Sequence, residues 1–330
     1  VVEKRKIIAV AVGGFSAERE VSLRSGKVVL QHLDPLLYEC YLLDIRAEGW
    51  FVLVKDQEIP FNRENASFLW EGETKKIEAL FNAVHGSPGE DGVLAAWCTM
   101  LRIPQTASEV LASALTFSKS ECNQLLRAWG YPVPKGLYPE VGEAPSAETV
   151  ERELGWPCFL KPSRSGSSIG ISKVKGPEEW PTALAQAQEI DPQLVVEEMV
   201  NGIELGCGVF QINGAVRALA VTDIVPQNEW FDYQSKYSGF SEEITPARIP
   251  EEQYRQVMAM SESVYQKLQL RGLVRVDYIL QATGELRMIE VNTVPGFSAE
   301  SILPKQAGHA GFSLDQLFGQ SLAQALNQPQ

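Results

Sequence analysis

Glu290 and Asn292 are two oxygen-bearing side chains spaced by two residues in the segment IEVNTVPGFSAES, residues 289–301. Because side chains alternate faces along a strand, both project the same way, just before a loop that contains Pro295 and Gly296. The strand therefore presents its oxygens as a pair, and the question is what such a pair would bind.

A second predicted strand precedes this one, and Thr283–Gly284 between them is typical of a two-residue hairpin turn. With that turn, Asp277 lies directly opposite Glu290, and Arg275 lies opposite Asn292. All four side chains then share one face. The other face is predicted to take Val276, Tyr278, Ile289 and Val291.

Two carboxylates directly opposite each other destabilise an antiparallel pair, and a divalent cation would relieve their repulsion. Asp, Glu and Asn oxygens with no nearby His or Cys suit Mg²⁺ or Mn²⁺, and so few protein ligands leave room for phosphate oxygens and water. The alternative is a solvated hairpin end with a hydrogen-bonded Asn. This segment alone leaves both interpretations open.

A glycine loop is predicted within CFLKPSRSGSSIGISKV, residues 158–174, which has the pattern of strand, loop and strand. Lys161 ends the first strand, while Gly166 and Gly170 lie in the loop. Such a loop can surround phosphate oxygens with backbone N–H groups, and Lys161 adds a positive charge. It is not a Walker A motif. A mobile surface loop is the alternative.

The segment LVVEEMVNGIELGCGVF, residues 194–210, predicts a strand that reaches Glu197 and Glu198, a turn, and a new strand that carries Glu204. Free backbone groups at such a hinge can bind an adenine edge, and a nearby carboxylate can accept hydrogen bonds from ribose hydroxyls. The alternative is acidic surface around a turn.

Strand-like and helix-like patterns alternate through the first third of the chain, as a parallel α/β sheet requires. KIIAVAV, residues 6–12, is interpreted as a first strand and not as an export signal, because its apolar run is short and leads into glycines. ALFNAVHG, residues 79–86, predicts another strand. Pro132 to Ser146 has the Pro/Gly content of a connection between lobes, and the remainder has an α+β character.

Charge and cysteine content limit the environment and the partners. A net charge of −13 argues against nucleic acid or an anionic membrane as the main partner. No apolar run approaches the roughly 20 residues of a membrane helix. The cysteines form no C-x-x-C pair, which favours a reducing, cytoplasmic location. They are Cys40, Cys98, Cys122, Cys158 and Cys207.

Six segments, in this order and at similar separations, resemble the ATP-grasp carboxylate–amine ligases, and among these the D-alanine–D-alanine ligases. They are GGFSAEREVSLRSG, HGSPGEDG, KPSRSGSSIGISKV, FDYQSKY, RVDYIL and EVNTVPGFSAES. The resemblance covers nearly the whole chain. It implies an ATP-grasp fold preceded by a Rossmann-like N-terminal domain with a parallel sheet, divided into residues 1–104, 105–188 and 189–330.

The resemblance also implies the reaction. ATP phosphorylates the carboxylate of one D-alanine, and the amine of a second D-alanine attacks the acyl phosphate, for peptidoglycan precursor synthesis. Positioning and charge neutralisation matter most in such a phosphoryl transfer. The implied cofactors are ATP and two Mg²⁺ (or Mn²⁺) ions, and a homodimer is expected.

The resemblance assigns the nucleotide and metal contacts to matching positions. The metal ligands are Asp277, Glu290 and Asn292. The phosphate-binding positions are Lys119, Lys161, Lys236 and the glycine loop at Gly166. The base and ribose contacts are Glu197, Glu204 and the backbone from Glu198 to Val200.

The resemblance places Arg275 and the Gly296 N–H at the oxyanion that forms during amine attack, where a fixed positive charge is effective. Arg275 could also form a structural salt bridge to Asp277, and the two roles can coexist. Ser301 matches the contact to the second substrate's carboxylate. His85 matches a histidine near the substrate amine, although a lone His at a strand end is more often structural.

Glu18 matches the carboxylate that receives the first D-alanine's ammonium group, held by Ser167 and Tyr237. Its alternative is an exposed glutamate at a helix start, favoured by the helix dipole. The aromatic-rich segment Val225 to Pro250 predicts a lid that would bring Lys236 and Tyr237 over the site and exclude water. An ordinary surface loop is the alternative.

Three rival functions remain. A related ligase could join D-alanine to D-lactate or D-serine, although Tyr237 argues against D-lactate, because such relatives differ at that position. A catalytically silent nucleotide-binding protein could share the fold, since fold alone does not establish activity. A nicotinamide dehydrogenase is weakly suggested by Gly13 and Gly14, which lack the expected glycine spacing.

Overall fold

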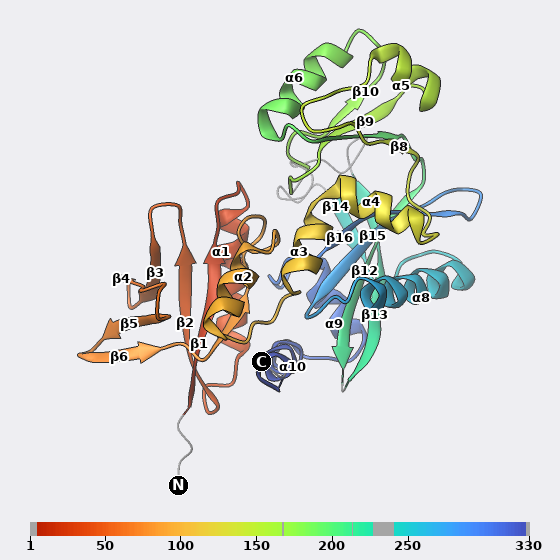
Figure 1. The fold of residues 1–330 in the computed structure, drawn as a ribbon. Coiled ribbons are helices and arrows are strands. Elements are labelled where there is room, and N and C mark those ends of the chain that lie inside the picture. The colour runs from red at the N-terminus through yellow and green to blue at the C-terminus, as the bar shows by residue number, and fades with distance from the viewer. Residues whose placement is uncertain (1–4, 167, 213, 227–240, 328–330) are drawn as a thin grey trace.

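The structure is a computed structural model that describes residues 5–166, 168–212, 214–226 and 241–327. Three lobes, each built on its own sheet, are visible in Figure 1. None of the helices within the described ranges is long and apolar enough to cross a membrane. The predicted domain boundaries at residues 104 and 188 stay predictions.

The first lobe contains a five-stranded sheet of order β4-β3-β2-β1-β7, in which β1 pairs in parallel with β2 and β7. Its elements are β1 (Lys6–Gly13), α1 (Arg19–His32), β2 (Tyr38–Ile45), β3 (Trp50–Val54), β4 (Gln57–Pro60), β7 (Ala79–Asn82) and α2 (Val93–Leu101). A separate hairpin is formed by β5 (Ser67–Trp70) and β6 (Glu73–Lys76). The apolar run of β1 is buried along nearly its whole length, as a central parallel strand requires.

The second lobe contains a four-stranded sheet of order β10-β9-β11-β8 with a small apolar core. Two helices, α3 (Val110–Phe117) and α4 (Lys119–Ala128), precede it. Its elements are β8 (Gly136–Leu137), α5 (Ala147–Glu153), β9 (Cys158–Pro162), β10 (Ser172–Val174), α6 (Trp180–Ile190) and β11 (Leu194–Glu198). The predicted strand–loop–strand around Lys161 is thus β9, the glycine loop and β10.

The third lobe contains a five-stranded antiparallel sheet of order β14-β13-β12-β15-β16. Its strands are β12 (Ile203–Ile212), β13 (Ala215–Pro226), β14 (Ser241–Ile244), β15 (Val274–Leu280) and β16 (Leu286–Asn292). Two helices, α8 (Glu251–Lys267) and α9 (Ile302–His309), contribute to different apolar cores and cover opposite faces of this sheet.

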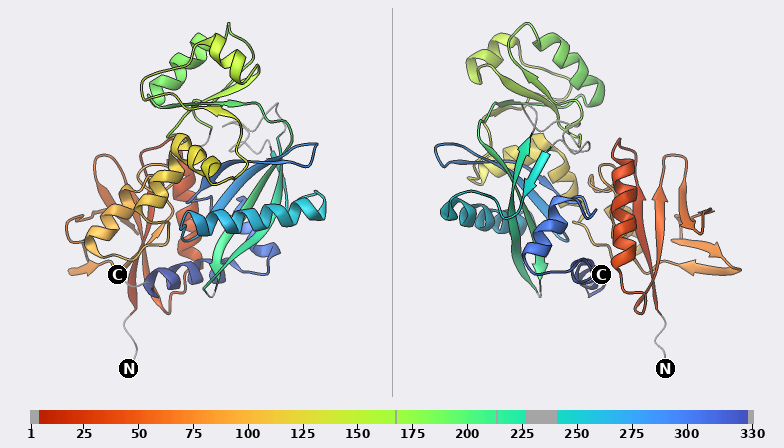
Figure 2. Two further views of the ribbon diagram at one scale, coloured as in Figure 1. Left: turned by 45° about the vertical axis from the view of Figure 1, so that its right-hand side comes forward. Right: turned by 180° about the vertical axis from the view of Figure 1, so that it is seen from behind.

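The C-terminal helix α10 (Leu314–Asn327) returns to the first lobe and packs against α1 and β7. In Figure 2 it lies between the first lobe and the third sheet. Phe318 on α10 meets Phe81 on β7 and Phe297 in edge-to-face contacts, with ring centroids 5.6 and 5.7 Å away. One apolar core therefore joins both ends of the chain.

The hairpin of β15 and β16 confirms the predicted pairing at its important end, where Asp277 faces Glu290 and Arg275 faces Asn292. The predicted turn is wrong, because Leu280 pairs with Leu286 and the Gly284 N–H bonds to the Gln281 carbonyl, which leaves a longer connection.

The pairing register of this hairpin shifts by one residue after Asp277, so the two ends of the hairpin follow different registers. Asp277 pairs with Glu290, whereas Tyr278 pairs with Met288, so Ile289 is the extra residue of a β-bulge. The predicted placement of Ile289 with the apolar face is also wrong: its side chain is partly exposed and lines the cavity described below. Val276, Tyr278 and Val291 do take the buried face.

Candidate active site

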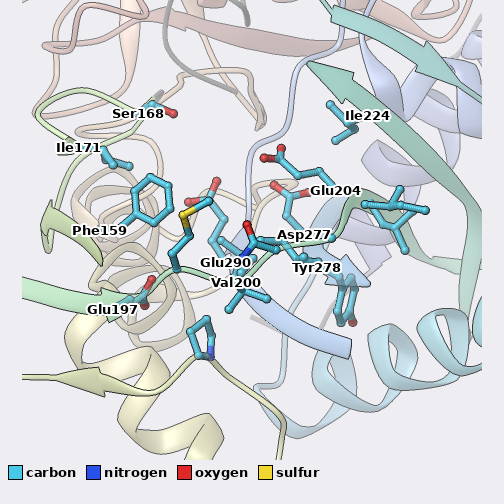
Figure 3. Close-up of a pocket in the computed structure, with 18 of the residues that line it drawn as sticks. Phe159, Ser168, Ile171, Glu197, Val200, Glu204, Ile224, Asp277, Tyr278 and Glu290 are labelled. Atoms are coloured by element: carbon cyan, nitrogen blue, oxygen red, sulfur yellow. The ribbon is translucent and has the colours of Figure 1, made fainter. Parts of the chain in front are cut away.

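A cavity of about 680 Å³ lies between the second and third sheets. Its walls come from β9, β11, β12, β13, β15 and β16, so residues far apart in the sequence meet there. Figure 3 shows Glu197 on one side of it, with the carboxylates of Glu204, Asp277 and Glu290 gathered toward the middle. Its size is in the range of small-molecule sites.

One end of the cavity, called here the base end, is built by Lys161, Glu197 and Asn123. The Lys161 ammonium lies 2.5 Å from one oxygen of Glu197, and the Asn123 amide donates to the other oxygen at 2.6 Å. All three side chains are buried. Asn123 is not among the residues that line the cavity, but it holds Glu197, and sequence reasoning missed it.

The hinge that follows the base end carries residues that were assigned to the base and the ribose. Glu198, Val200 and Glu204 line the cavity, and Glu198 is anchored through its backbone N–H to the Lys135 carbonyl at 2.9 Å. The Glu198 side chain accepts a hydrogen bond from the Lys135 N–H at 2.8 Å and is thus engaged within the protein. A contact of the Glu198 backbone with a base stays a prediction.

The glycine loop brings the first lobe to the cavity. The Lys119 ammonium donates to the Ser165 carbonyl at 2.6 Å, which fixes the loop to the start of α4. A Cβ atom at Gly166 would lie 2.4 Å from Glu18 Oε2, so only glycine permits this close approach of loop and carboxylate. Glu18 is buried, which excludes the exposed helix-start interpretation. Ser167 lies outside the described residues.

A second group of residues, called here the hairpin face, comprises Arg275, Asp277, Glu290 and Asn292. The first three line the cavity away from the base end, and Asn292 lines a smaller cavity beside it. Arg275 binds both oxygens of Asp277, at 2.7 and 2.8 Å, and the Asn292 amide donates to Asp277 at 2.9 Å. The ammonium of Lys119 lies 3.8 Å from Glu290. Burial alone would lower the pKa of Arg275, but the attraction of Asp277 outweighs it and raises that pKa, so the guanidinium stays charged.

The hairpin face suits a metal that shares its coordination with a ligand. Two carboxylates and an amide supply the hard oxygens that Mg²⁺ and Mn²⁺ prefer. Within the described ranges, no group of three or more His, Cys, Asp or Glu side chains could hold a metal by itself. The residues fit ions that are bound together with phosphate oxygens and water, and metal binding here stays a prediction.

The loop after β16 places the two predicted substrate contacts side by side. A Cβ atom at Gly296 would lie 2.6 Å from Ser301 Oγ, so the Gly296 backbone and the Ser301 hydroxyl are neighbours. Ser301 stands at the N-cap of α9 without using its side chain as a cap. Its hydroxyl instead bonds to Ser298 Oγ at 2.8 Å.

His85 is buried below this loop. Its Nδ1 donates to the Val294 carbonyl at 2.8 Å, and its Nε2 then accepts from the Ser25 hydroxyl at 3.1 Å. The Ser25 oxygen also receives the Phe297 N–H at 3.2 Å. Burial lowers the pKa of His85, so the ring is neutral. Its contacts tie α1 to the loop that carries Gly296, and its role near an amine stays a prediction.

Glu90 was not singled out by sequence reasoning, although it lies in HGSPGEDG. Its two oxygens accept from the Gly86 N–H at 2.8 Å and the Val294 N–H at 3.2 Å. Burial raises its pKa to about 8. Glu90 thus joins two loops that border the cavity.

Two predicted site residues, Lys236 and Tyr237, lie outside the described residues with most of the predicted lid, 227–240. The remaining residues expected to bind nucleotide or metal line the main cavity or a small one beside it. Glu18, Gly296 and Ser301 lie in the loops and helix start described above. The roles of all these residues stay predictions.

Family models account for most of the chain. Residues 7–108 match the model described as "D-ala D-ala ligase N-terminus", and residues 137–323 match "D-ala D-ala ligase C-terminus". A "D-alanine--D-alanine ligase" of Christiangramia forsetii is 40% identical over 325 residues, which are 98% of this chain and 99% of that relative.

Two solved structures are similar to the whole fold. D-alanyl-alanine synthetase A from Vibrio cholerae has a TM-score of 0.89 and 25% identity, with 98% of this chain and 99% of that chain covered. VanG D-Ala:D-Ser ligase from Enterococcus faecalis has a TM-score of 0.86 and 31% identity, with 98% and 100% covered. The chain belongs to the D-alanine–D-alanine ligase family.

Proposed function

We propose that this protein is an ATP-dependent ligase that joins two D-alanines into D-alanyl-D-alanine through an acyl phosphate, for peptidoglycan synthesis. The observation that carries the proposal is the hairpin face, where Asp277 faces Glu290 beside Arg275 at the wall of a cavity of nucleotide size. Such a face suits phosphoryl transfer, which depends on positioning and on neutralising charge.

Nucleotide binding is assigned to the base end and the glycine loop. Glu197 and the backbone from Glu198 to Val200 contact the adenine, and Glu204 accepts from the ribose hydroxyls. Lys119, Lys161, Lys236 and the loop at Gly166 hold the phosphates. Asp277, Glu290 and Asn292 would hold two Mg²⁺ (or Mn²⁺) ions, which supply charge neutralisation when bound.

Substrate binding is assigned to the loops around the hairpin face. Glu18, held by Ser167 and Tyr237, receives the ammonium group of the first D-alanine. Ser301 binds the carboxylate of the second. Arg275 and the Gly296 N–H stabilise the negative oxygen that develops when the amine attacks. The salt bridge from Arg275 to Asp277 holds the guanidinium in place for this role.

A second candidate differs only in the acceptor. The resemblance to VanG D-Ala:D-Ser ligase, which is 31% identical, makes D-serine the alternative second substrate. The chemistry and the donor site would be the same in both cases.

A homodimer and a cytoplasmic location are part of the proposal. Support for the dimer comes from α2 and α3, which contain no charged residue and expose large apolar side chains. Exposed apolar patches of this kind often mark protein interfaces. The side chains are Val93, Met100, Val110 and Leu111.

The decisive experiment measures phosphate release from ATP with D-alanine, D-serine and D-lactate, offered separately and in pairs, with products identified by mass spectrometry. We expect release with D-alanine alone and a D-alanyl-D-alanine product. A mixed product formed in preference would establish the alternative acceptor. A folded protein that binds ATP but forms no product from any pair would contradict the proposal and support the silent nucleotide-binding protein.

A further inference from the structure

The base end contains a hydrogen bond, from Asn123 to Glu197, that plays no part in the roles assigned so far to Lys161 and Glu197. The two oxygens of Glu197 have separate donors, Lys161 at 2.5 Å and Asn123 at 2.6 Å. Exposure is 2% for Glu197, 3% for Asn123 and 7% for Lys161. A buried carboxylate with a fixed donor on each oxygen cannot rotate freely, so its remaining lone pairs point in set directions.

The donor Asn123 comes from α4, the helix that begins at Lys119. Side chains four residues apart lie on the same helix face, about 6 Å apart along the axis. The start of α4 is anchored next to the glycine loop, because the Lys119 N–H donates to the Ser163 carbonyl at 3.1 Å and the Ser120 N–H donates to Ser163 Oγ at 3.0 Å. One rigid helix therefore reaches both the phosphate side and the base end of the cavity.

We propose that Asn123 is a positioning residue for recognition of the base: it orients the Glu197 carboxylate so that this group accepts a hydrogen bond from the 6-amino group of adenine. The inference rests on the proposed function, in which Glu197 contacts adenine. The Lys161 ammonium and the Asn123 NH₂ group can only donate hydrogen bonds, so both Glu197 oxygens act as acceptors. The carboxylate therefore offers a ligand acceptors and no donor. A 6-oxo purine would place its own acceptor against that negative charge and would be rejected.

Without Asn123, the Glu197 carboxylate would keep Lys161 as its hydrogen-bond donor and could rotate toward the Lys161 ammonium. Its charge would stay, and so would the phosphate contacts of Lys161. The expected loss is therefore selective for the 6-amino group and does not extend to nucleotide binding in general.

The test compares ATP with purine riboside triphosphate, which carries hydrogen in place of the 6-amino group, and with inosine triphosphate. Binding to the whole protein is measured by calorimetry with Mg²⁺ and without D-alanine. For Asn123→Leu, and for the smaller Asn123→Ala, we expect the preference for ATP over purine riboside triphosphate to fall about tenfold, as for one hydrogen bond to a charged group. Affinity for purine riboside triphosphate should stay nearly unchanged.

Gln124→Leu is the matched control, because Gln124 follows on the same helix and its amide donates to Ser120 in its own turn, away from Glu197. It should leave the preference intact. An equal loss for ATP and purine riboside triphosphate in the Asn123 variants would overturn the inference, as would a wild-type protein that does not distinguish the two. A wild-type protein that discriminates between them but ligates no D-alanine would contradict the proposed function and leave this inference standing.

Discussion

The base end and the hairpin face lie across one cavity from each other, yet they treat charge differently. At the base end the side chains of Lys161 and Glu197 are 9% and 3% exposed, and their opposite charges neutralise each other. On the hairpin face the side chains of Asp277 and Glu290 are 17% and 25% exposed. Arg275 pairs with Asp277, while Lys119 stands off Glu290 at 3.8 Å. One end is complete within the protein, whereas the other suits cations that arrive with a ligand.

Because the charges are arranged differently, variants at the two places should affect different properties, namely the free energy of unfolding and the rate of ligation. Removing one partner of a buried ion pair leaves an uncompensated charge and destabilises the fold. Removing one of two facing carboxylates relieves repulsion. We therefore expect variants at the base end to weaken the fold and variants on the hairpin face to weaken the reaction.

The largest effect is expected for Glu290→Gln on the hairpin face. Loss of a metal ligand should lower ligation by about a thousandfold or more, since bound ions contribute several kcal/mol of charge stabilisation. The free energy of unfolding without ligands should stay the same or rise. Steady-state ligation and urea unfolding measure both quantities. Ordinary turnover at normal Mg²⁺ would show that Glu290 is not a ligand.

The next effect is expected at the base end. Lys161→Met leaves Glu197 charged and buried, which should lower the free energy of unfolding by about 3 kcal/mol. Glu197→Gln in the same chain removes that charge and should recover much of the loss. Urea unfolding of the single and double variants tests this. A single variant that loses less than about 1 kcal/mol would behave like a surface pair and break the contrast between the two ends.

A smaller and graded effect is expected for two residues outside the described ranges. Lys236→Ala removes a charge assigned to the phosphates and should reduce ligation by about ten- to a hundredfold, because bonds to charged groups are the stronger ones. Tyr237→Phe removes one neutral hydrogen bond and should reduce it by at most about tenfold. Steady-state kinetics of both variants give the order, and the reverse order would contradict the assignment of these two residues.

The smallest effect is a pH dependence that arises next to the hairpin face. Burial lowers the pKa of His85 below its ordinary value, so the unfolded chain binds this proton first as pH falls. The contribution of His85 to stability is thus present above the unfolded pKa of about 6.5 and is lost below it, by at most about 1.4 kcal/mol per pH unit.

His85→Gln isolates this contribution. The wild type should lose more stability than the variant between pH 7 and pH 5 in parallel unfolding experiments. His309→Gln is the matched control, because His309 is an exposed histidine in the last turn of α9. Equal slopes for wild type and His85→Gln would show that the ring is not buried in its neutral form.

Local patterns predicted the hairpin face but not its details. Alternation along two strands predicts that Asp277 and Glu290 can share one face, whereas their direct facing was predicted from a two-residue turn. The bulge at Ile289 does not follow, because a longer connection and an extra residue offset each other and leave the distal pairing unchanged. The predicted two-residue turn was wrong, yet the residue pairs that it predicted at the site are correct.

Asn123 shows a different limit. Its partner Glu197 is 74 positions away and lies on another element, so no spacing in the sequence marks the contact. A single Asn within a helix is ordinarily interpreted as surface. Lys161 and Gly166 were predictable because the loop pattern around them is local. Contacts between lobes require the tertiary fold, and most of the polar network around His85 and Glu90 is of this kind.

The helix α10 has a consequence for how the protein is made. Phe81 and the apolar face of α1 and β7 are covered by α10, yet that helix is the last of the described elements to leave the ribosome. Until then the first lobe exposes part of its core, a state in which nascent chains aggregate or recruit chaperones. Every residue assigned to binding or chemistry has been synthesised by Ser301. The loop that carries Gly296 gains its core contact with α10, between Phe297 and Phe318, only afterwards. Activity should therefore appear with the final helix and not with the last site residue.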